Sequence, residues 1–373
     1  MFRRKLGIVF CIMLAFSLIS LALVSAFGKK RPGRAEAGDG GELVVAASFY
    51  PVWVIVENVC AGVEGVRAVN LTQNHTGCLH DYQLTAADML TLETADILVI
   101  NGGDMELFVT EIVKKLPGLP VVDACRDISL LEGSGHSHEH EEAADGNRKS
   151  AEEASSAGNS KTGSVNVDGI SSDRLRKTAS AGADGISSGR SSEVPPLREE
   201  DEYGHAVNGH VWMDPARYEQ QIRTVAAALA AADAEHAAQY AENAERYCGK
   251  VDALRQEYEE ALTELRGTEA VLFHDAFYYL CAACGIEVLH SVDMDADTAL
   301  SAGELAELAD EIRYHGVTYL LADETGRAAA EQLAAETGAQ VIDLNPLTDG
   351  DGRADSYLEG MRKNLEILSG LGR

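Results

Sequence analysis

Short apolar runs alternate with helical patterns in two separate regions of the chain. Before residue 132, helical segments separate four strand-like runs, at residues 43–49, 66–71, 97–100 and 121–123. After residue 267 the alternation returns, with strand-like runs at residues 271–273, 286–289, 317–321 and 341–344. Strands that alternate with helices predict parallel sheets with helices on their faces. We therefore expect an α/β protein with two lobes, each built on a parallel-type sheet flanked by helices.

A long helical stretch connects the two alternating regions. After Pro215 it contains no proline, and it holds a single glycine before residue 267. Asp233 can cap a new helix start, and apolar residues then recur at helical spacing as far as Leu265. About 33 residues at a rise of 1.5 Å would make a rod of roughly 50 Å, which is too long for one sheet layer. We predict one long rigid helix over residues 233–266, joining an N-terminal lobe (42–232) to a C-terminal lobe (267–373).

Residues 132–202 interrupt the first lobe. They contain almost no large apolar side chains, so they cannot bury enough surface to fold, and we expect a disordered insertion. Near its start, His136, His138 and His140 alternate with carboxylates. This pattern predicts auxiliary capture of a borderline-soft divalent cation, with a solvated linker as the alternative.

The N-terminus predicts export. Arg3, Arg4 and Lys5 precede an apolar run that continues to Phe27, and basic residues follow it. We interpret residues 1–27 as a signal peptide or an N-terminal anchor, since about 20 apolar residues can span a bilayer. Whether it is cleaved stays open. The rest of the chain is expected outside the cytoplasm, in the periplasm or at the cell surface.

Charge and cysteine content narrow the classes of partner. The chain carries 31 Lys and Arg against 60 Asp and Glu, for a net charge of −29. A field of that sign repels phosphate backbones, so we expect no nucleic-acid partner. Six cysteines lie beyond the N-terminal segment, and their pairing in an exported protein cannot be derived from sequence. For Cys281 and Cys284, spaced C-x-x-C in an apolar run, we expect a structural thiol or disulfide role.

Polar residues at strand ends indicate where the chemistry lies, because ligands of open α/β sheets bind beyond the carboxyl ends of strands. His80 follows the second strand-like run, and His274 follows the first run of the second lobe. Asp323 and Glu324 end a later strand, and His210 lies where the chain returns to ordered structure after the insertion. Three imidazoles and a carboxylate form a ligand set that zinc accepts.

Six motifs, in order along the chain, carry a family resemblance. They are Ser-Phe-Tyr-Pro at 48–51, His-Asp-Tyr at 80–82, His-Val-Trp-Met-Asp-Pro at 210–215, Phe-His-Asp-Ala-Phe at 273–277, Leu-Asn-Pro-Leu at 344–347 and Tyr-Leu-Glu-Gly-Met at 357–361. Together they resemble the metal-binding receptor subclass of ABC-transporter substrate-binding proteins, the zinc and manganese receptors. The resemblance implies two lobes joined by a long helix, with a divalent metal buried between them.

The resemblance also implies ligands and partners. His80, His210 and His274 match the three imidazole positions of the family. Asp323 is the first choice for the fourth ligand, followed by Glu324 or water. Some relatives use an Asp near the last strand, where this chain has Asn345. The partner would be a membrane-embedded ABC permease, and we expect the receptor to be monomeric.

Ligand softness favours Zn(II) as the bound ion. Three neutral imidazoles suit zinc better than manganese, which prefers more carboxylate. Manganese-type relatives often carry Glu where this chain has His274. The alternatives are a manganese receptor, a surface adhesin, or a secreted zinc hydrolase, because three imidazoles and a water also form a catalytic zinc site. The sequence has no His-Glu-x-x-His motif, and we predict a receptor rather than an enzyme.

Overall fold

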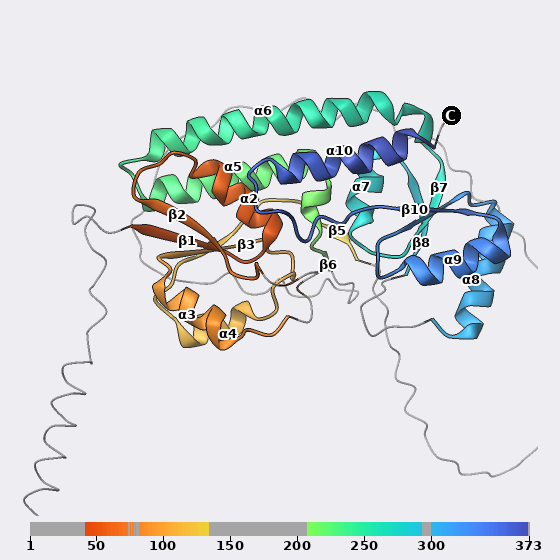
Figure 1. Ribbon diagram of the computed structural model, residues 1–373, viewed down its shortest axis with the longest axis horizontal. Helices are drawn as coiled ribbons and strands as arrows, with labels where there is room; N and C mark the ends of the chain where they lie inside the picture. Colours follow the sequence, from red (N-terminus) through yellow and green to blue (C-terminus); the bar gives the residue numbers. More distant parts are fainter. Residues whose placement is uncertain are drawn as a thin grey trace, which may run out of the picture. The chain divides into compact units, whose positions relative to one another are not determined.

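The computed structural model describes residues 42–73, 75, 77, 79, 82–133, 207–292 and 300–371 (Figure 1). All of these residues belong to one compact unit. The N-terminal apolar segment, His80, and the insertion histidines His136, His138 and His140 lie outside the described residues. Within the described ranges, no helix combines the length and apolar character that a membrane span needs.

The first lobe is built on a four-stranded parallel sheet. In chain order its strands are β1 (Leu43–Ala47), β2 (Val66–Asn70), β3 (Ile97–Ile100) and β4 (Val121–Asp123), arranged β2-β1-β3-β4. The helices between them are α2 (Tyr50–Val59), α3 (Ala86–Thr94) and α4 (Val109–Lys115). The sheet strands β1 and β3 are almost entirely buried. A strand that is apolar on both faces is expected when helices cover both faces of a parallel sheet.

The second lobe repeats the architecture. Its strands are β7 (Glu269–Leu272), β8 (Glu287–Ser291), β9 (Tyr319–Ala322) and β10 (Gln340–Asp343), arranged β10-β9-β7-β8 and all parallel. Its helices are α7 (Phe277–Cys284), α8 (Ala302–His315), α9 (Arg327–Thr337) and α10 (Ser356–Ser369). The α/β fold class with two parallel sheets is therefore confirmed.

The connection between the lobes consists of two helices, α5 (Pro215–Ala232) and α6 (Ala237–Ala261), which pack against each other. The predicted helix start at Asp233 is wrong. Asp233 is the C-cap of α5, and its carboxylate interacts with the His236 imidazole (2.7 Å) and accepts a hydrogen bond from the Tyr240 hydroxyl (2.8 Å). The long helix therefore begins at Ala237, and Figure 1 shows it running alongside α10.

A short antiparallel pair, β5 (Leu131–Glu132) and β6 (Val207–Asn208), was not predicted. Leu131 pairs with Asn208, and Glu132 pairs with Val207. The chain therefore returns after residue 206 to a position beside the one it left after Gly133. A 3-10 turn (Val211–Met213) follows β6 and leads directly into α5.

The lobes share one core. A single cluster of buried apolar side chains includes Val45 and Val99 from the first sheet, Tyr218 and Val251 from α5 and α6, and Leu321 from the second sheet. A smaller cluster, built around Val271, Leu308 and Leu333, belongs to the second lobe alone. The α5 and α6 helices therefore connect the lobes and also contribute apolar side chains to the core that both lobes share.

The pairing of Glu132 with Val207 predicts that the intervening chain can be replaced by a tight turn. We expect a variant with Asn-Gly in place of residues 133–206 to keep the fold, since two-residue Asn-Gly loops suit antiparallel pairs. A shorter loop also costs less closure entropy, so the thermal midpoint should equal or exceed that of the parent. Circular dichroism during heating checks this. A midpoint lower by more than about 5 °C would show that the segment is structural.

Candidate metal centre

The His210 side chain is held on the segment that links β6 to α5. It is 3% exposed. The preceding Gly209 packs against Gly103, which follows β3. A Cβ added to Gly209 would lie 2.5 Å from the Gly103 carbonyl oxygen. The Asn101 side chain, at the carboxyl end of β3, donates a hydrogen bond to the Gly209 carbonyl at 2.8 Å. The His210 backbone is therefore anchored to the carboxyl edge of the first sheet.

His274 and Asp323 come from neighbouring strands of the second sheet. His274 follows β7 by two residues, and Asp323 follows β9 directly. Because β7 and β9 are parallel neighbours, their carboxyl ends lie at one edge. There the His274 Nδ1 is 3.0 Å from Asp323 Oδ2. Both side chains are mostly buried, at 14% and 10% exposure.

The structure brings the two imidazoles together across the lobes. The ring centroids of His210 and His274 are 5.3 Å apart, and the ring planes are nearly perpendicular at 86°. No group of three or more His, Cys, Asp or Glu within the described ranges is arranged to hold a metal ion by itself. A site built on this pair would need a further ligand, and His80, predicted for that role, lies outside the described residues.

Asp323 has both carboxylate oxygens engaged. Oδ2 faces His274, while Oδ1 accepts the backbone N–H groups of Thr325 (3.1 Å) and Gly326 (3.0 Å). Burial alone would raise the pKa of Asp323. The net pKa is nevertheless below its usual value, because Asp323 accepts hydrogen bonds from His274 and from the Gly326 N–H and interacts with the positive charge of His274. An ionised carboxylate only accepts, so in neutral His274 the proton lies on Nδ1. Metal coordination by His274 would then use Nε2. The predicted alternative, Glu324, is exposed to solvent.

Trp212 packs against His210 and connects it to the second lobe, a role that sequence analysis missed. The Trp212 and His210 ring centroids are 5.2 Å apart. The Phe49 ring packs edge-on against the Trp212 ring, with centroids 5.1 Å apart. The indole Nε1–H donates to the Pro346 carbonyl at 2.8 Å. The Tyr357 hydroxyl donates to the Trp212 carbonyl at 2.7 Å. The indole therefore lies between the imidazole and the chain that follows β10.

A buried carboxylate supports the same region from the first lobe. Glu106 is 3% exposed, and Oε1 accepts hydrogen bonds from the Ser48 hydroxyl (2.6 Å) and the Asn101 N–H (2.7 Å). Oε2 accepts the Gly102 N–H at 3.0 Å. Burial raises the pKa of Glu106 to about 7, against the lowering effect of these three donors. Through Asn101, which also bonds Gly209, Glu106 holds the backbone beside His210.

Comparison with known proteins identifies the family. The family model "ZnuA: Zinc-uptake complex component A periplasmic" matches residues 45–370. The chain belongs to the ZnuA family.

Individual relatives have low sequence identity to this chain, but the alignments cover most of its length. The zinc-binding protein AdcA of Streptococcus pyogenes serotype M3 is 25% identical over 364 residues, which cover 96% of this chain and 60% of AdcA. The high-affinity zinc uptake system protein ZnuA of Bacillus subtilis is 24% identical over 353 residues, covering 93% of this chain and 92% of that protein. The chain thus spans about 60% of the length of AdcA.

A solved structure shows the same fold. The substrate-binding protein FpvC of Pseudomonas aeruginosa, in complex with Mn²⁺, superposes with a TM-score of 0.64 at 19% identity. The match covers 88% of this chain and 97% of FpvC. The two-lobed architecture of this ZnuA-family chain is therefore shared with a metal-bound binding protein.

Four cysteines in the described part of this ZnuA-family chain are buried thiols with raised pKa values. Cys60, Cys248, Cys281 and Cys284 are free and buried. Burial raises the pKa of Cys60 and of Cys284 to about 12, and that of Cys281 further. Thiols with raised pKa values are protonated at neutral pH and bind metals poorly. Cys281 and Cys284 are therefore buried thiols with no disulfide between them, and the structural role of the pair stays a prediction.

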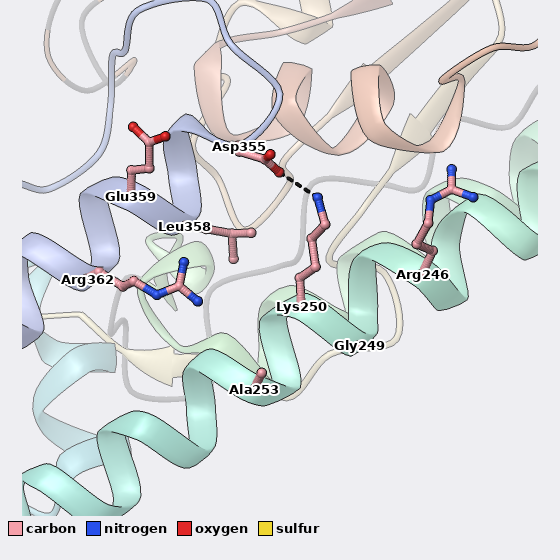
Figure 2. A pocket seen from close by; sticks show the side chains of 8 residues that line it. All are labelled: Arg246, Gly249, Lys250, Ala253, Asp355, Leu358, Glu359 and Arg362. Atoms are coloured by element: carbon pink, nitrogen blue, oxygen red, sulfur yellow. Dashed lines mark hydrogen bonds and ion pairs between the residues drawn. The ribbon is translucent and has the colours of Figure 1, made fainter.

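The ZnuA-family chain also has a cavity between α6 and α10, and none of the predicted ligands lines it. The cavity has a volume of about 490 Å³, and Figure 2 shows the α6 and α10 side chains that line it. Lys250 points toward Asp355 and pairs with it at 2.8 Å, and Arg362 pairs with Glu257 at 3.1 Å. Both of these cations are therefore paired with neighbouring carboxylates.

The raised pKa of Glu106 predicts a pH-dependent contribution to stability. The folded protein keeps this proton up to about pH 7, whereas an ordinary Glu releases it near 4.5. The contribution is therefore complete below about pH 4.5 and is lost as pH rises through 7. Between pH 5 and 8 the loss should be roughly 2–3 kcal/mol.

Urea unfolding at both pH values measures this contribution. Glu106→Gln should lose that much less stability than the parent over the interval. Glu111→Gln is the matched control, because Glu111 is exposed and its pKa is lowered by Lys115, so this variant should follow the parent. Equal changes in the parent and in Glu106→Gln would contradict the assignment.

Proposed function

We propose that this chain is an extracytoplasmic receptor that captures Zn(II) between its lobes and delivers it to an ABC permease for import. The observation that carries the proposal is the pairing of His210 with His274, one imidazole from each lobe, with ring centroids 5.3 Å apart. Two imidazoles contributed by different lobes suit an ion that is bound and later released. Membership of the zinc-uptake family supports transport rather than catalysis.

The proposed ligands are His80, His210 and His274. For the latter two, hydrogen bonds at Nδ1 direct coordination to Nε2, as is usual for metal-binding histidines whose other nitrogen is engaged. Asp323 supplies the carboxylate of the site. Its contact with His274 and its two backbone donors favour an orienting role over direct ligation. A water molecule or another oxygen would then complete the tetrahedral set.

Zinc is the proposed cargo for two reasons. Neutral imidazoles suit zinc better than manganese, which prefers more carboxylate ligands. The names of AdcA and of the Bacillus subtilis ZnuA both specify zinc, which supports the same ion here. Location outside the cytoplasm agrees with the periplasmic description of the family. The monomeric state stays a prediction.

The histidines of the insertion, His136, His138 and His140, have a proposed auxiliary role as a weaker zinc-capturing segment. In the Asn-Gly variant described above, only the weaker zinc equivalents should disappear. Loss of the tightest equivalent would instead assign the main site to the insertion.

The central test is removal of single imidazoles. His210→Ala or His274→Ala should weaken zinc binding at least tenfold, because each substitution removes one of three proposed nitrogen donors. His315→Ala is a matched control, since His315 is exposed at the end of α8, and it should bind zinc like the parent. Titration against a competing chelator measures the affinities, with manganese in parallel. Parental zinc affinity in either site variant would show that the site is misassigned.

A further inference from the structure

Asn208 contacts the backbones that carry both described imidazoles. It is 2% exposed and lies at the end of β6. Its Oδ1 accepts the His210 backbone N–H at 2.9 Å and lies 2.9 Å from His210 Nδ1. Its Nδ2 donates to the carbonyl of Asp275, the residue after His274, also at 2.9 Å. A single amide therefore joins the two lobes at the candidate metal centre.

The orientation of this amide follows from its partners. The His210 backbone N–H can only donate, so it must face the amide oxygen. The Asp275 carbonyl can only accept, so it must face the amide nitrogen. The oxygen that faces the His210 imidazole is then an acceptor, and Nδ1 must carry the proton. The lone pair of neutral His210 therefore lies on Nε2.

The backbone of Asn208 is fixed as firmly as its side chain. The Tyr279 hydroxyl of α7 donates to the Asn208 carbonyl at 2.8 Å and accepts the Leu131 N–H at 2.9 Å. The Arg217 guanidinium lies over the Tyr279 ring, 5.3 Å from its centroid. The Tyr279 hydroxyl therefore attaches the Asn208 backbone to α7, whereas the contacts with His210 come from the Asn208 side chain.

We propose that Asn208 is a positioning residue for metal binding. It holds His210 in the Nδ1–H tautomer and keeps its Nε2 directed to the site shared with His274. The part of this inference that concerns zinc rests on the proposed function. His274 is oriented in the same way by a carboxylate, because its Nδ1 faces Asp323 Oδ2. A carboxylate raises the basicity of the imidazole more than a neutral amide does. The two ligands are therefore oriented by groups of different charge.

The alternative is a purely structural role, in which Asn208 joins the two lobes but does not affect the His210 tautomer. Three variants separate these roles. Asn208→Ala removes the contacts to His210 and to Asp275. Asn208→Asp keeps an oxygen for His210 but loses the donor to the Asp275 carbonyl. Tyr279→Phe removes a hydroxyl that joins the lobes without touching the imidazole, and it serves as the matched control.

The first measurement needs no metal. Nitrogen-15 NMR of the histidine rings in the full, metal-free chain reports each tautomer, and the His210→Ala spectrum identifies the His210 signals. The parent, Asn208→Asp and Tyr279→Phe should all show the Nδ1–H form. Asn208→Ala should show a substantial Nε2–H population. An Nε2–H tautomer in the parent would overturn the proposal without any variant, which keeps it testable if Asn208→Ala does not fold.

The second measurement is zinc affinity by chelator competition. Asn208→Ala should bind zinc about 10- to 100-fold more weakly, the usual effect of losing a group that orients a ligand. Asn208→Asp and Tyr279→Phe should stay within about threefold of the parent or bind more tightly. An altered tautomer with unchanged zinc affinity, or an equal loss in Tyr279→Phe and Asn208→Ala, would overturn the positioning role. A parent that binds no zinc refutes the proposed function instead, and the metal-free spectra still decide the tautomer.

Discussion

The hydrogen bonds that attach residues 207–214 to both lobes are the interaction on which the candidate metal centre depends. This short segment carries His210, yet it belongs to neither sheet. Asn101 holds it to the first lobe through the Gly209 carbonyl, and Asn208 holds it to the second through the Asp275 carbonyl. Because these donors and acceptors are buried, losing one partner would leave an unsatisfied polar group, which costs about 1–3 kcal/mol. The segment is therefore held by buried hydrogen bonds to both lobes.

Packing around the segment supports the same conclusion. The Trp212 indole contacts the His210 ring on one side and is bonded to the Pro346 carbonyl on the other. The Tyr357 ring stacks on Tyr218 of α5 with centroids 4.0 Å apart, while its hydroxyl reaches the Trp212 carbonyl. The two lobes thus meet through one continuous core, in which α5, α6 and α10 participate. Two imidazoles from opposite lobes can then face each other with little conformational entropy left to lose on binding.

Much of the fold and part of the site could be predicted from sequence. Apolar periodicity located both parallel sheets, and the rule that ligands bind at the carboxyl ends of strands selected His274 and Asp323, which lie 3.0 Å apart. The boundary at Asp233 was mistaken because Asp stabilises a helix start and also serves at a C-cap, where its partners here are His236 and Tyr240. An Asp such as Asp233 can lie at either end of a helix, and its tertiary contacts determine which end it occupies.

The supporting residues could not be predicted. Asn208 reaches Asp275 over 67 positions of sequence, and Trp212 reaches Pro346 over 134. No local pattern encodes such contacts, which exist only once both lobes are assembled. Asparagine two residues before a candidate ligand is a usable local signal, because its side chain can accept that residue's backbone N–H, as it does here. The roles of His80 and of the insertion histidines remain predictions.

X-ray absorption at the zinc edge measures whether imidazoles hold the ion, as expected if His210 and His274 from the two lobes are its ligands. The sample is the Asn-Gly variant loaded with one equivalent of zinc, so that the insertion histidines cannot contribute. A zinc site with these imidazole ligands should give nitrogen and oxygen neighbours at about 2.0–2.1 Å, with the outer-shell scattering of imidazole rings. Sulfur at about 2.3 Å, or a shell of oxygens without imidazole scattering, would contradict it.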